Sequence, residues 1–254
     1  MGWQELQSTE VLVSSGDAES RRFGFQILNA QCGAQSEGRE SELSQALSSE
    51  IYELAVVRYP VHLEGVDQLL AKFGNKTIDV DPTVYWGISI RNDVPNRLPA
   101  NVAIQRIDES SLEVAEQVIN SAFSGYRSHW YDNPRTQNIR MEDAYNEWVK
   151  NKITKNESRC YLMFVDGEPA GFAMTETREQ VGEILLAGIC TQFQSRGLYR
   201  HLLAHIENEM LSEKSAELVI STQSQNRNVQ RAWDKYGLVP LMTVRTVHVE
   251  NRKS

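Results

Sequence analysis

Hydrophobic and polar positions follow two periods along this chain, and the change of period separates predicted strands from predicted helices. The apolar run at residues 184–189 is short enough to be a buried strand. At residues 198–210 the apolar positions recur with the spacing of one helical face. Gly197 lies at the boundary between these two segments. The pattern therefore predicts a strand, a glycine-containing turn and a helix.

The remaining segments add further strands and helices. Strands or extended segments are predicted at residues 22–27, 52–59, 77–90, 102–106, 160–165, 171–177, 217–222 and 239–249. Helices are predicted at residues 42–47, 61–73, 112–123 and 141–152, and after Asn226. Gly74 is the expected residue after the second of these helices, and Ser110 or Ser111 is the expected cap of the third.

The segment at residues 91–100 contains two prolines among polar residues and resembles a linker. We therefore expect a small N-terminal α/β domain at residues 1–98 and a second domain at residues 99–254. Together they predict an α+β fold with a mixed sheet. The first domain contains no constellation of catalytic residues, so it is expected to be structural or to form one wall of a substrate cleft.

The composition narrows the class of protein. The chain has 254 residues, of which 41% are hydrophobic and 24% are charged, as in soluble globular proteins. No apolar stretch approaches the roughly 18 residues that a membrane span needs, and the N-terminus does not resemble a secretory signal. The three cysteines are odd in number and widely spaced, which favours free thiols in the cytoplasm and no metal site. The net charge of −8 argues against nonspecific binding to nucleic acid.

The turn before the helix at 198–210 is a candidate anion site. A turn that leads into a helix presents unpaired backbone N–H groups and the positive end of the helix dipole. A diphosphate is the natural occupant of such a site. The sequence in this turn is Gln194-x-x-Gly197-x-Tyr199.

This turn resembles the pyrophosphate-binding signature Q/R-x-x-G-x-G/A of the GNAT superfamily of N-acetyltransferases. Glu183 stands at the start of the preceding strand, where that superfamily often has its general base. Asn226-x-x-Val229-x-x-x-Trp233-x-x-x-Gly237 follows the spacing of the superfamily pattern N-x-x-A-x-x-x-Y-x-x-x-G. The resemblance implies a GNAT fold whose sheet splays where two adjacent parallel strands part.

The resemblance also implies acetyl-CoA as the cofactor. The pantetheine arm would pair with the strand near Ile189 and Thr191, and backbone N–H groups near Gly188 and Ile189 would stabilise the reacting oxygen if the strand bulges there. Asn226 would brace the loop before the last helix. The implied cofactor contacts are Ile189, Thr191, Gln194, Ser195, Arg196, Gly197, Leu198, Tyr199 and Asn226.

Acetyl transfer to an amine requires that the amine lose a proton. Glu183 is the first candidate for the base and His129 the second, although either side chain is also compatible with a solvated surface position. Trp233 stands where the superfamily has a tyrosine that protonates the leaving thiolate. An indole N–H can donate a hydrogen bond but does not transfer a proton near neutrality. Tyr236, which is nearby in sequence, is a further candidate for the catalytic tyrosine. The alternative to an enzyme is a noncatalytic protein that binds acetyl-CoA.

Within the superfamily, the chain is most similar to the dTDP-fucosamine N-acetyltransferases. The similarity rests on residues 20–25, on the aromatic segment at 122–131 with Tyr145 and Trp148, and on the two-domain layout. It implies that the acceptor is the 4-amino group of a nucleotide-linked amino-deoxy sugar. The implied substrate contacts are Tyr126, Arg127, Trp130 and Tyr131. A different small-molecule or protein amine remains an alternative acceptor. Core packing is an alternative role for Trp130. A homodimer is left open.

Overall fold

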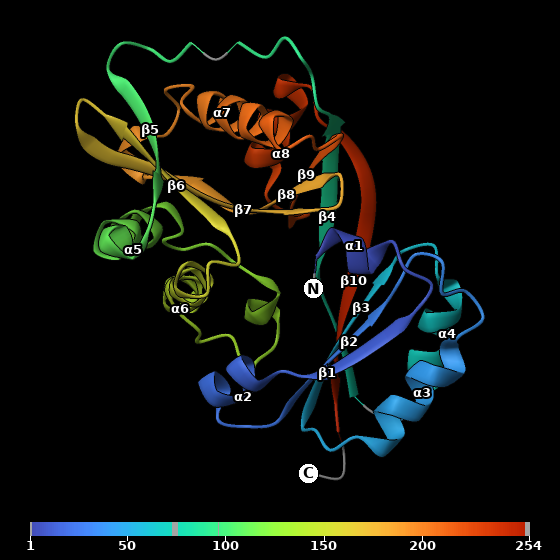
Figure 1. Ribbon diagram of the computed structural model, residues 1–254. Helices are drawn as coiled ribbons and strands as arrows, with labels where there is room; N and C mark the ends of the chain where they lie inside the picture. Colours follow the sequence, from blue (N-terminus) through green and yellow to red (C-terminus); the bar gives the residue numbers. More distant parts are fainter. Residues whose placement is uncertain (1, 73–75, 96, 252–254) are drawn as a thin grey trace.

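The computed structural model describes residues 2–72, 76–95 and 97–251, and these residues form one mixed sheet with helices against it (Figure 1). The strands are β1 (Val11–Ser15), β2 (Ile27–Cys32), β3 (Leu54–Pro60), β4 (Lys76–Ser89), β5 (Val102–Ile107), β6 (Arg159–Val165), β7 (Glu168–Arg178), β8 (Val181–Ile189), β9 (Glu217–Gln223) and β10 (Val239–Glu250). The α-helices are α1 (Trp3–Leu6), α2 (Asp17–Phe23), α3 (Glu40–Ser49), α4 (Glu64–Lys72), α5 (Leu112–Ala122), α6 (Met141–Thr154), α7 (Tyr199–Ser212) and α8 (Arg227–Tyr236). Short 3₁₀ turns are η1 (Glu109–Ser111), η2 (His129–Asp132) and η3 (Thr191–Phe193). The predicted α+β class with a mixed sheet is confirmed.

The strand order is β1-β2-β3-β10-β4-β9-β8-β7-β6-β5. The long strands β4 and β10 pair with each other in the middle of this order and connect the two halves of the molecule (Figure 1). Only two neighbouring pairs are parallel among the described strands, β2 with β3 and β8 with β9. All the other neighbours are antiparallel.

The parallel pair β8–β9 is short. The two strands pair only from Val181 opposite Glu217 to Ile184 opposite Ile220. Beyond Ile184, β8 continues to pair with β7 on its other side as far as Ile189. The sheet therefore splays between β8 and β9, as the resemblance implied.

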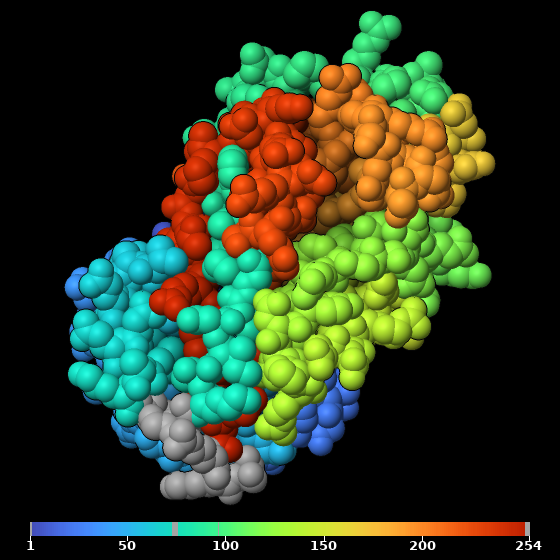
Figure 2. All heavy atoms as spheres, turned by 180° about the vertical axis from the view of Figure 1, so that it is seen from behind, coloured from blue at the N-terminus to red at the C-terminus, as the bar shows by residue number. Residues whose placement is uncertain are grey.

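The hydrophobic interior consists of separate clusters on the two halves of the sheet. The larger cluster lies between α5, α6, α7, α8 and strands β6 to β9. A second cluster lies between α3, α4 and strands β2, β3 and β10. A third cluster joins the halves, because Ile27 and Val56 of the N-terminal strands pack with Trp130, Ile139 and Met141. On the face shown in Figure 2, yellow-green residues lie beside teal residues.

The structure corrects the prediction of a strand at residues 22–27. The chain is helical through Phe23, and Gly24 ends the helix in the left-handed region with φ 76°. Strand β2 begins only at Ile27. The alternation of Phe23 and Phe25 looked like a strand pattern, but it arises because both rings pack around the helix end, with ring centroids 5.9 Å apart.

Other predicted boundaries differ in smaller ways. The predicted end of the second helix at Phe73 and Gly74 lies outside the described residues. The side chain that caps the turn before α5 belongs to Asp108, which accepts the Ser110 N–H at 2.9 Å. Ser111 occupies the N-cap position of α5 without a side-chain hydrogen bond.

The division at residues 98 and 99 is not a break in the sheet. Strand β4 from the N-terminal part lies between β9 and β10 from the C-terminal part. The division into two domains therefore stays a prediction, supported only by the separate clusters. The described part of the 91–100 segment has no helix or strand, as predicted. None of the described helices has the length and apolar character of a membrane span.

Candidate active site

A cleft of about 1210 Å³ opens where β8 and β9 part and extends toward the N-terminal strands. Ligand pockets commonly measure roughly 300–1,000 Å³, so this cleft has room for two small ligands or one long one. One end is bounded by the turn at 194–199 and by α8. The other end is bounded by Gln31, Arg58 and the α2 side chains Glu19 and Arg22.

The free edge of β8 forms one wall of the cleft. Cys190 N–H donates to Ala170 O of β7 at 2.8 Å. Because backbone groups alternate in direction along a strand, the N–H of Ile189 points to the opposite edge, where β9 no longer pairs. Gln194 Nε2 donates to Ile189 O at 3.0 Å and ties the following turn to this edge. The edge can accept an extended ligand as an added strand.

The bulge in β8 lies elsewhere than expected. The pairing with β7 shifts between Met174 and Thr175, whose partners are Leu186 and Ile184, so Leu185 is the extra residue. The condition of a bulge near Gly188 and Ile189 is therefore not met. Gly188 is small for a packing reason, since an added Cβ would lie 3.0 Å from atoms of Ala122 and Phe123.

The turn at 194–199 has the backbone of an anion site. Ser195 and Gly197 both adopt the left-handed region, with φ 61° and 73°. Alternation of left- and right-handed residues turns successive N–H groups toward one point. The helix α7 then begins at Tyr199. A Cβ on Gly197 would contact nothing within 4 Å, so this glycine is required by its backbone angle and not by crowding.

The predicted cofactor residues divide into those that line the cleft and those that do not. The lining ones are Ile189, Gln194, Ser195, Gly197, Leu198, Tyr199 and Asn226. Arg196 lies outside it, with its guanidinium 5.1 Å from the centre of the Phe193 ring. Thr191 is also outside and holds the end of α5, because its Oγ1 donates to Ser121 O at 3.1 Å.

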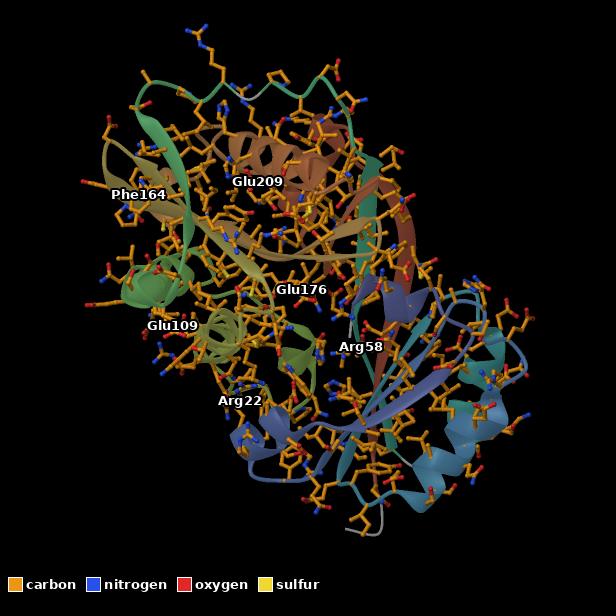
Figure 3. The ribbon with its side chains drawn as sticks, viewed as in Figure 1. Arg22, Arg58, Glu109, Phe164, Glu176 and Glu209 are labelled. Atoms are coloured by element: carbon orange, nitrogen blue, oxygen red, sulfur yellow. The ribbon has the colours of Figure 1, made fainter. Side chains whose placement is uncertain are left out.

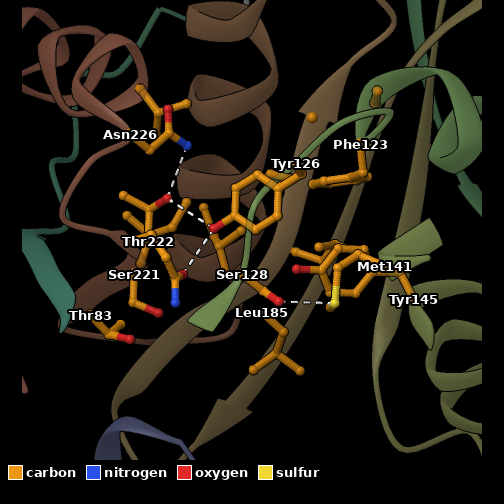
Figure 4. A pocket seen from close by; sticks show the side chains of 18 of the residues that line it. Thr83, Phe123, Tyr126, Ser128, Met141, Tyr145, Leu185, Ser221, Thr222 and Asn226 are labelled. Atoms are coloured by element: carbon orange, nitrogen blue, oxygen red, sulfur yellow. Dashed lines mark hydrogen bonds between the residues drawn. The ribbon is translucent and has the colours of Figure 1, made fainter. Parts of the chain in front are cut away.

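Polar side chains hold the end of β9 at the splay (Figure 4). Asn226 Nδ2 donates to Thr222 Oγ1 at 3.0 Å, so Asn226 braces the loop before α8. The Tyr126 hydroxyl donates to Gln223 Oε1 at 3.0 Å and lies 3.5 Å from Thr222 Oγ1. Burial raises the pKa of Tyr126. These contacts link the 124–134 loop to the end of the strand and place an aromatic ring in the cleft.

Trp233 is almost fully buried, with 1% of its surface exposed, and lines the cleft. Its Nε1–H donates to the Tyr199 hydroxyl at 3.2 Å. Among the described residues, no acceptor is found for the hydrogen of the Tyr199 hydroxyl itself. Burial raises the pKa of Tyr199 to about 12. The Trp233 indole of α8 therefore holds the hydroxyl of Tyr199, from α7, at the cleft.

Glu183 does not line the cleft. Its Oε2 accepts the Trp3 N–H of α1 at 2.9 Å, so the N-terminal helix covers this carboxylate. Burial raises the pKa of Glu183, although the bond from Trp3 opposes this. Burial raises the pKa of Tyr85, which does line the cleft, and the nearby charge of Glu183 raises it further.

The Tyr236 hydroxyl is directed away from the cleft. It donates to Oε2 of Glu207 at 2.6 Å, and Glu207 has no exposed surface. Arg91 Nη2 also donates to this oxygen at 2.7 Å. Burial alone would raise the pKa of Glu207, but the hydrogen bonds from Arg91 and Tyr236 lower it. Tyr236 thus helps to anchor the start of the 91–100 segment to α7 and α8.

His129 lines the cleft but both its ring nitrogens are engaged. Arg58 Nη2 lies 2.9 Å from Nε2, and His248 Nε2 lies 2.9 Å from Nδ1. On the other side of His248, Asn133 Nδ2 lies 3.1 Å from Nδ1. Burial, with the nearby Arg58 charge, lowers the pKa of His129 well below 6.5 and that of His248 to about 3. Both imidazoles are therefore neutral near pH 7.

The predicted substrate residues are also divided. Tyr126 and Trp130 line the cleft. Trp130 also packs on Phe23, with ring centroids 4.9 Å apart. Arg127 lies outside the cleft, 62% exposed, with its guanidinium 4.0 Å from Asp132. Tyr131 is outside as well and packs against the cluster that joins the two halves.

Sequence reasoning missed the polar residues that the N-terminal strands contribute. Gln31, Arg58 and Tyr85 line the cleft, and Arg58 lies at the junction of the two halves (Figure 3). The available signal was an arginine inside the otherwise apolar segment of β3, LAVVRYP. A charged residue at such a position requires a partner or a ligand.

Comparison with known proteins agrees with this geometry. Residues 121–238 match the sequence profile of the Acetyltransferase (GNAT) family. This segment contains β8, the turn, α7 and α8. Residues 121–238 form a GNAT acetyltransferase domain. The chain is accordingly an acetyl-CoA-dependent acyltransferase, because this family transfers acetyl groups from acetyl-CoA.

Solved structures resemble most of the chain. A GCN5-related N-acetyltransferase from Sphaerobacter thermophilus has a TM-score of 0.61 at 12% identity, covering 94% of this chain and 76% of that one. One from Kribbella flavida has a TM-score of 0.57 at 15% identity, covering 89% and 81%. A GNAT-family acetyltransferase from Colwellia psychrerythraea has a TM-score of 0.55 at 14% identity, covering 89% and 78%. At these identities the likeness concerns the fold. A search of curated proteins by sequence found no match.

The residues of the GNAT domain fit acetyl-CoA on structural grounds. The unpaired edge of β8 suits an extended pantetheine arm, and the turn at 194–199 suits a diphosphate. Arg231 and Lys235 of α8 line the same end of the cleft and add positive charge. The described residues contain no group of three or more His, Cys, Asp or Glu side chains that could hold a metal ion.

Proposed function

We propose that this protein transfers an acetyl group from acetyl-CoA to the primary amine of a small molecule bound in the N-terminal half of the cleft. The proposed acceptor is the 4-amino group of a nucleotide-linked amino-deoxy sugar. The observation that carries the proposal is the continuity of one cleft from the turn at 194–199, past the splayed strands, to Arg58. Its size supports simultaneous occupation by the cofactor and an acceptor.

The chemistry is a direct transfer. Acetyl-CoA supplies a thioester whose carbonyl carbon bonds to the amine nitrogen while the C–S bond breaks, leaving the coenzyme A thiolate and one proton from the amine. The N–H groups on the free edge of β8 are the proposed donors to the carbonyl oxygen, since donors fixed in advance stabilise developing charge. The N–H of Ile189 is the first of these.

We propose Glu183 as the final acceptor of the amine proton. Its raised pKa makes it a stronger base than an exposed glutamate. Because α1 covers this carboxylate, the proton must travel through water or through Tyr85. His129 is less suited to the role, because both of its nitrogens already have partners.

Tyr199 is the proposed donor to the leaving sulfur. The hydroxyl accepts from Trp233, so its own hydrogen is free for the thiolate. Its pKa of about 12 lies well above the value of about 8.5 for a thiol. Full proton transfer is therefore unfavourable, and the side chain acts by hydrogen bonding. The thiolate then leaves as an anion.

The proposal is tested with purified protein, acetyl-CoA and a panel of amines, by measuring free thiol and identifying the product by mass spectrometry. The panel contains nucleotide-linked amino sugars, free amino sugars, amino acids, polyamines and a lysine-containing peptide. Preferred acetylation of a nucleotide-linked amino sugar supports the full proposal. Preference for another amine would replace the acceptor. Tight acetyl-CoA binding without transfer to any amine would favour a noncatalytic binding protein.

A further inference from the structure

Three polar side chains form a row across strands β2, β3 and β10 beside the acceptor end of the cleft. Gln31 of β2 pairs in register with Arg58 of β3, and Arg58 pairs with Thr246 of β10. Residues that lie directly opposite each other in a sheet point to the same face. The row therefore occupies one face, and Gln31 and Arg58 line the cleft.

The second observation concerns the contacts of Arg58 with the described residues. Among the described residues it forms no ion pair, and its only hydrogen-bond contact is with His129 Nε2 at 2.9 Å. Glu19 and Tyr85 are near enough to offset part of the lowering that burial imposes on its pKa. The neighbouring Arg22 differs, because its guanidinium is 2.7 Å from Glu147. Arg58 is thus a cation at a cleft wall that forms no ion pair with the described residues.

Gln31 provides an independent indication of a ligand. It is 2% exposed, and its Nε2 has no hydrogen-bond partner within the described chain. Thr246 Oγ1, in the same row, also has no partner there. Native proteins rarely leave a buried donor unsatisfied, because this costs about 1–3 kcal/mol. An oxygen-rich ligand group beside Arg58 would satisfy the Gln31 amide.

The hydrogen bonds between His129, His248 and Asn133 also favour separation of the Arg58 guanidinium from His129. When Arg58 donates to His129 Nε2, the hydrogen of neutral His129 must be on Nδ1, from which it donates to His248 Nε2. The hydrogen of His248 is then on Nδ1, opposite the Asn133 amino group. Asn133 cannot simply turn over, because its Oδ1 accepts the Arg135 N–H at 2.9 Å.

In that arrangement two donors face each other, the Nδ1–H of His248 and the amino group of Asn133. This mismatch disappears when Arg58 no longer donates to His129. The His129 hydrogen then moves to Nε2, His248 donates from Nε2 to His129 Nδ1, and Asn133 donates to His248 Nδ1. Every remaining contact has one donor and one acceptor. A ligand that attracts the Arg58 guanidinium would therefore remove the one N–H donor for which the two histidines have no matching acceptor.

We propose that Arg58 and Gln31 bind an anionic oxygen group of the acceptor, either a phosphate or a carboxylate. A guanidinium and a neighbouring amide together offer several N–H donors to such a group. This subsite lies apart from the coenzyme A end of the cleft, which is served by the 194–199 turn and α8. The inference rests on the proposed function, in that the anion belongs to the molecule that receives the acetyl group.

The first test compares acceptors that differ only in charge. One pair is an amino sugar and its phosphate ester, and the other is an amino acid and its carboxamide. The wild-type protein should use the anionic member of one pair with a kcat/KM about ten- to a hundredfold higher, as expected for a charge-assisted contact. The pair that shows the preference identifies phosphate or carboxylate. Equal use of the neutral and anionic members of both pairs would overturn the subsite.

The variants are Arg58→Gln and Gln31→Leu, with Arg22→Gln as the matched control. Arg58→Gln should abolish the preference for the anion without changing the KM for acetyl-CoA. Gln31→Leu should weaken the preference without lowering the melting temperature, because it removes a donor that has no protein partner. Arg22→Gln should keep the preference, since Glu147 already neutralises that arginine. A preference that survives in Arg58→Gln, or is lost equally in Arg22→Gln, would overturn the assignment.

A binding experiment separates this inference from the proposed function. Calorimetry with inorganic phosphate and with acetate measures the subsite without turnover. One of the two anions should bind the wild-type protein at least tenfold more tightly than Arg58→Gln. That difference without acetyl transfer would reject the proposed function and retain an anion site. Acetyl transfer without that difference would retain the function and reject the site.

Discussion

The pair formed by Tyr199 and Trp233 gives the most specific prediction about the chemistry. Tyr199→Phe removes the hydroxyl that the Trp233 Nε1–H donates to and that we propose faces the leaving sulfur. Trp233→Phe removes only the donor behind it. The first change should therefore slow the transfer step more than the second.

The expected magnitude follows from the pKa of Tyr199. At about 12, it lies three to four pH units above that of a thiol, so full proton transfer to the thiolate is uphill by roughly 5 kcal/mol. Only a hydrogen bond to an anion remains, which is worth about 1.5–3 kcal/mol. Tyr199→Phe should lower kcat by about ten- to 150-fold, and Trp233→Phe should lower it by less than about tenfold.

The assay is single-turnover thiol release with saturating acetyl-CoA and acceptor. Calorimetry with acetyl-CoA and thermal unfolding serve as controls, because Tyr199→Phe also leaves the Trp233 N–H unpaired and should cost about 1–3 kcal/mol of stability. A thousandfold loss in Trp233→Phe, with acetyl-CoA affinity intact, would refute the argument. So would an unchanged kcat in Tyr199→Phe.

Three further predictions concern the turn, the splay and the buried histidines. Gly197→Val should weaken acetyl-CoA binding in calorimetry, because φ 73° costs a branched residue about 1–3 kcal/mol; unchanged affinity in the folded variant would contradict this. Tyr126→Phe should raise the acceptor KM and leave acetyl-CoA affinity unchanged, whereas equal effects on both ligands would indicate a structural role. The pKa values of His129 and His248 are lowered in the folded state, so below about pH 6.5 the unfolded chain binds more protons than the folded one. The free energy of unfolding should therefore fall as the pH drops from 6.5 toward 3. The slope should be up to about 1.4 kcal/mol per pH unit for each histidine, and urea unfolding of His248→Gln should show a shallower one; an unchanged slope would count against this explanation.

The sequence predicted the elements whose period and boundary residues agree. The segment from β8 to α7 was predicted as a strand, a turn and a helix because the apolar period changes at Gly197, where the backbone requires a glycine. The prediction for residues 22–27 failed because Phe23 and Phe25 satisfy a strand pattern and a helix-end pattern equally. Only the packing around Trp130 distinguishes the two.

The backbone of the turn at 194–199 could be predicted because its residues are close in sequence. The acceptor end could not, because it depends on contacts between distant segments. Arg58 and His129 are 71 positions apart and are brought together by the joining of the two halves. Likewise, nothing in the sequence near Glu183 indicated that Trp3 would cover its carboxylate. The orientation of Tyr236 toward Glu207 depends on the packing of α7 against α8.

The central claim is tested most directly by one measurement on the wild-type protein, the acceptor-dependent release of thiol from acetyl-CoA across the amine panel. The account predicts that at least one small amine releases thiol in a one-to-one ratio with an N-acetylated product. It predicts further that an amine with a phosphate or carboxylate group has the highest kcat/KM. Tight binding of acetyl-CoA with no acceptor-dependent thiol release from any amine would contradict the account.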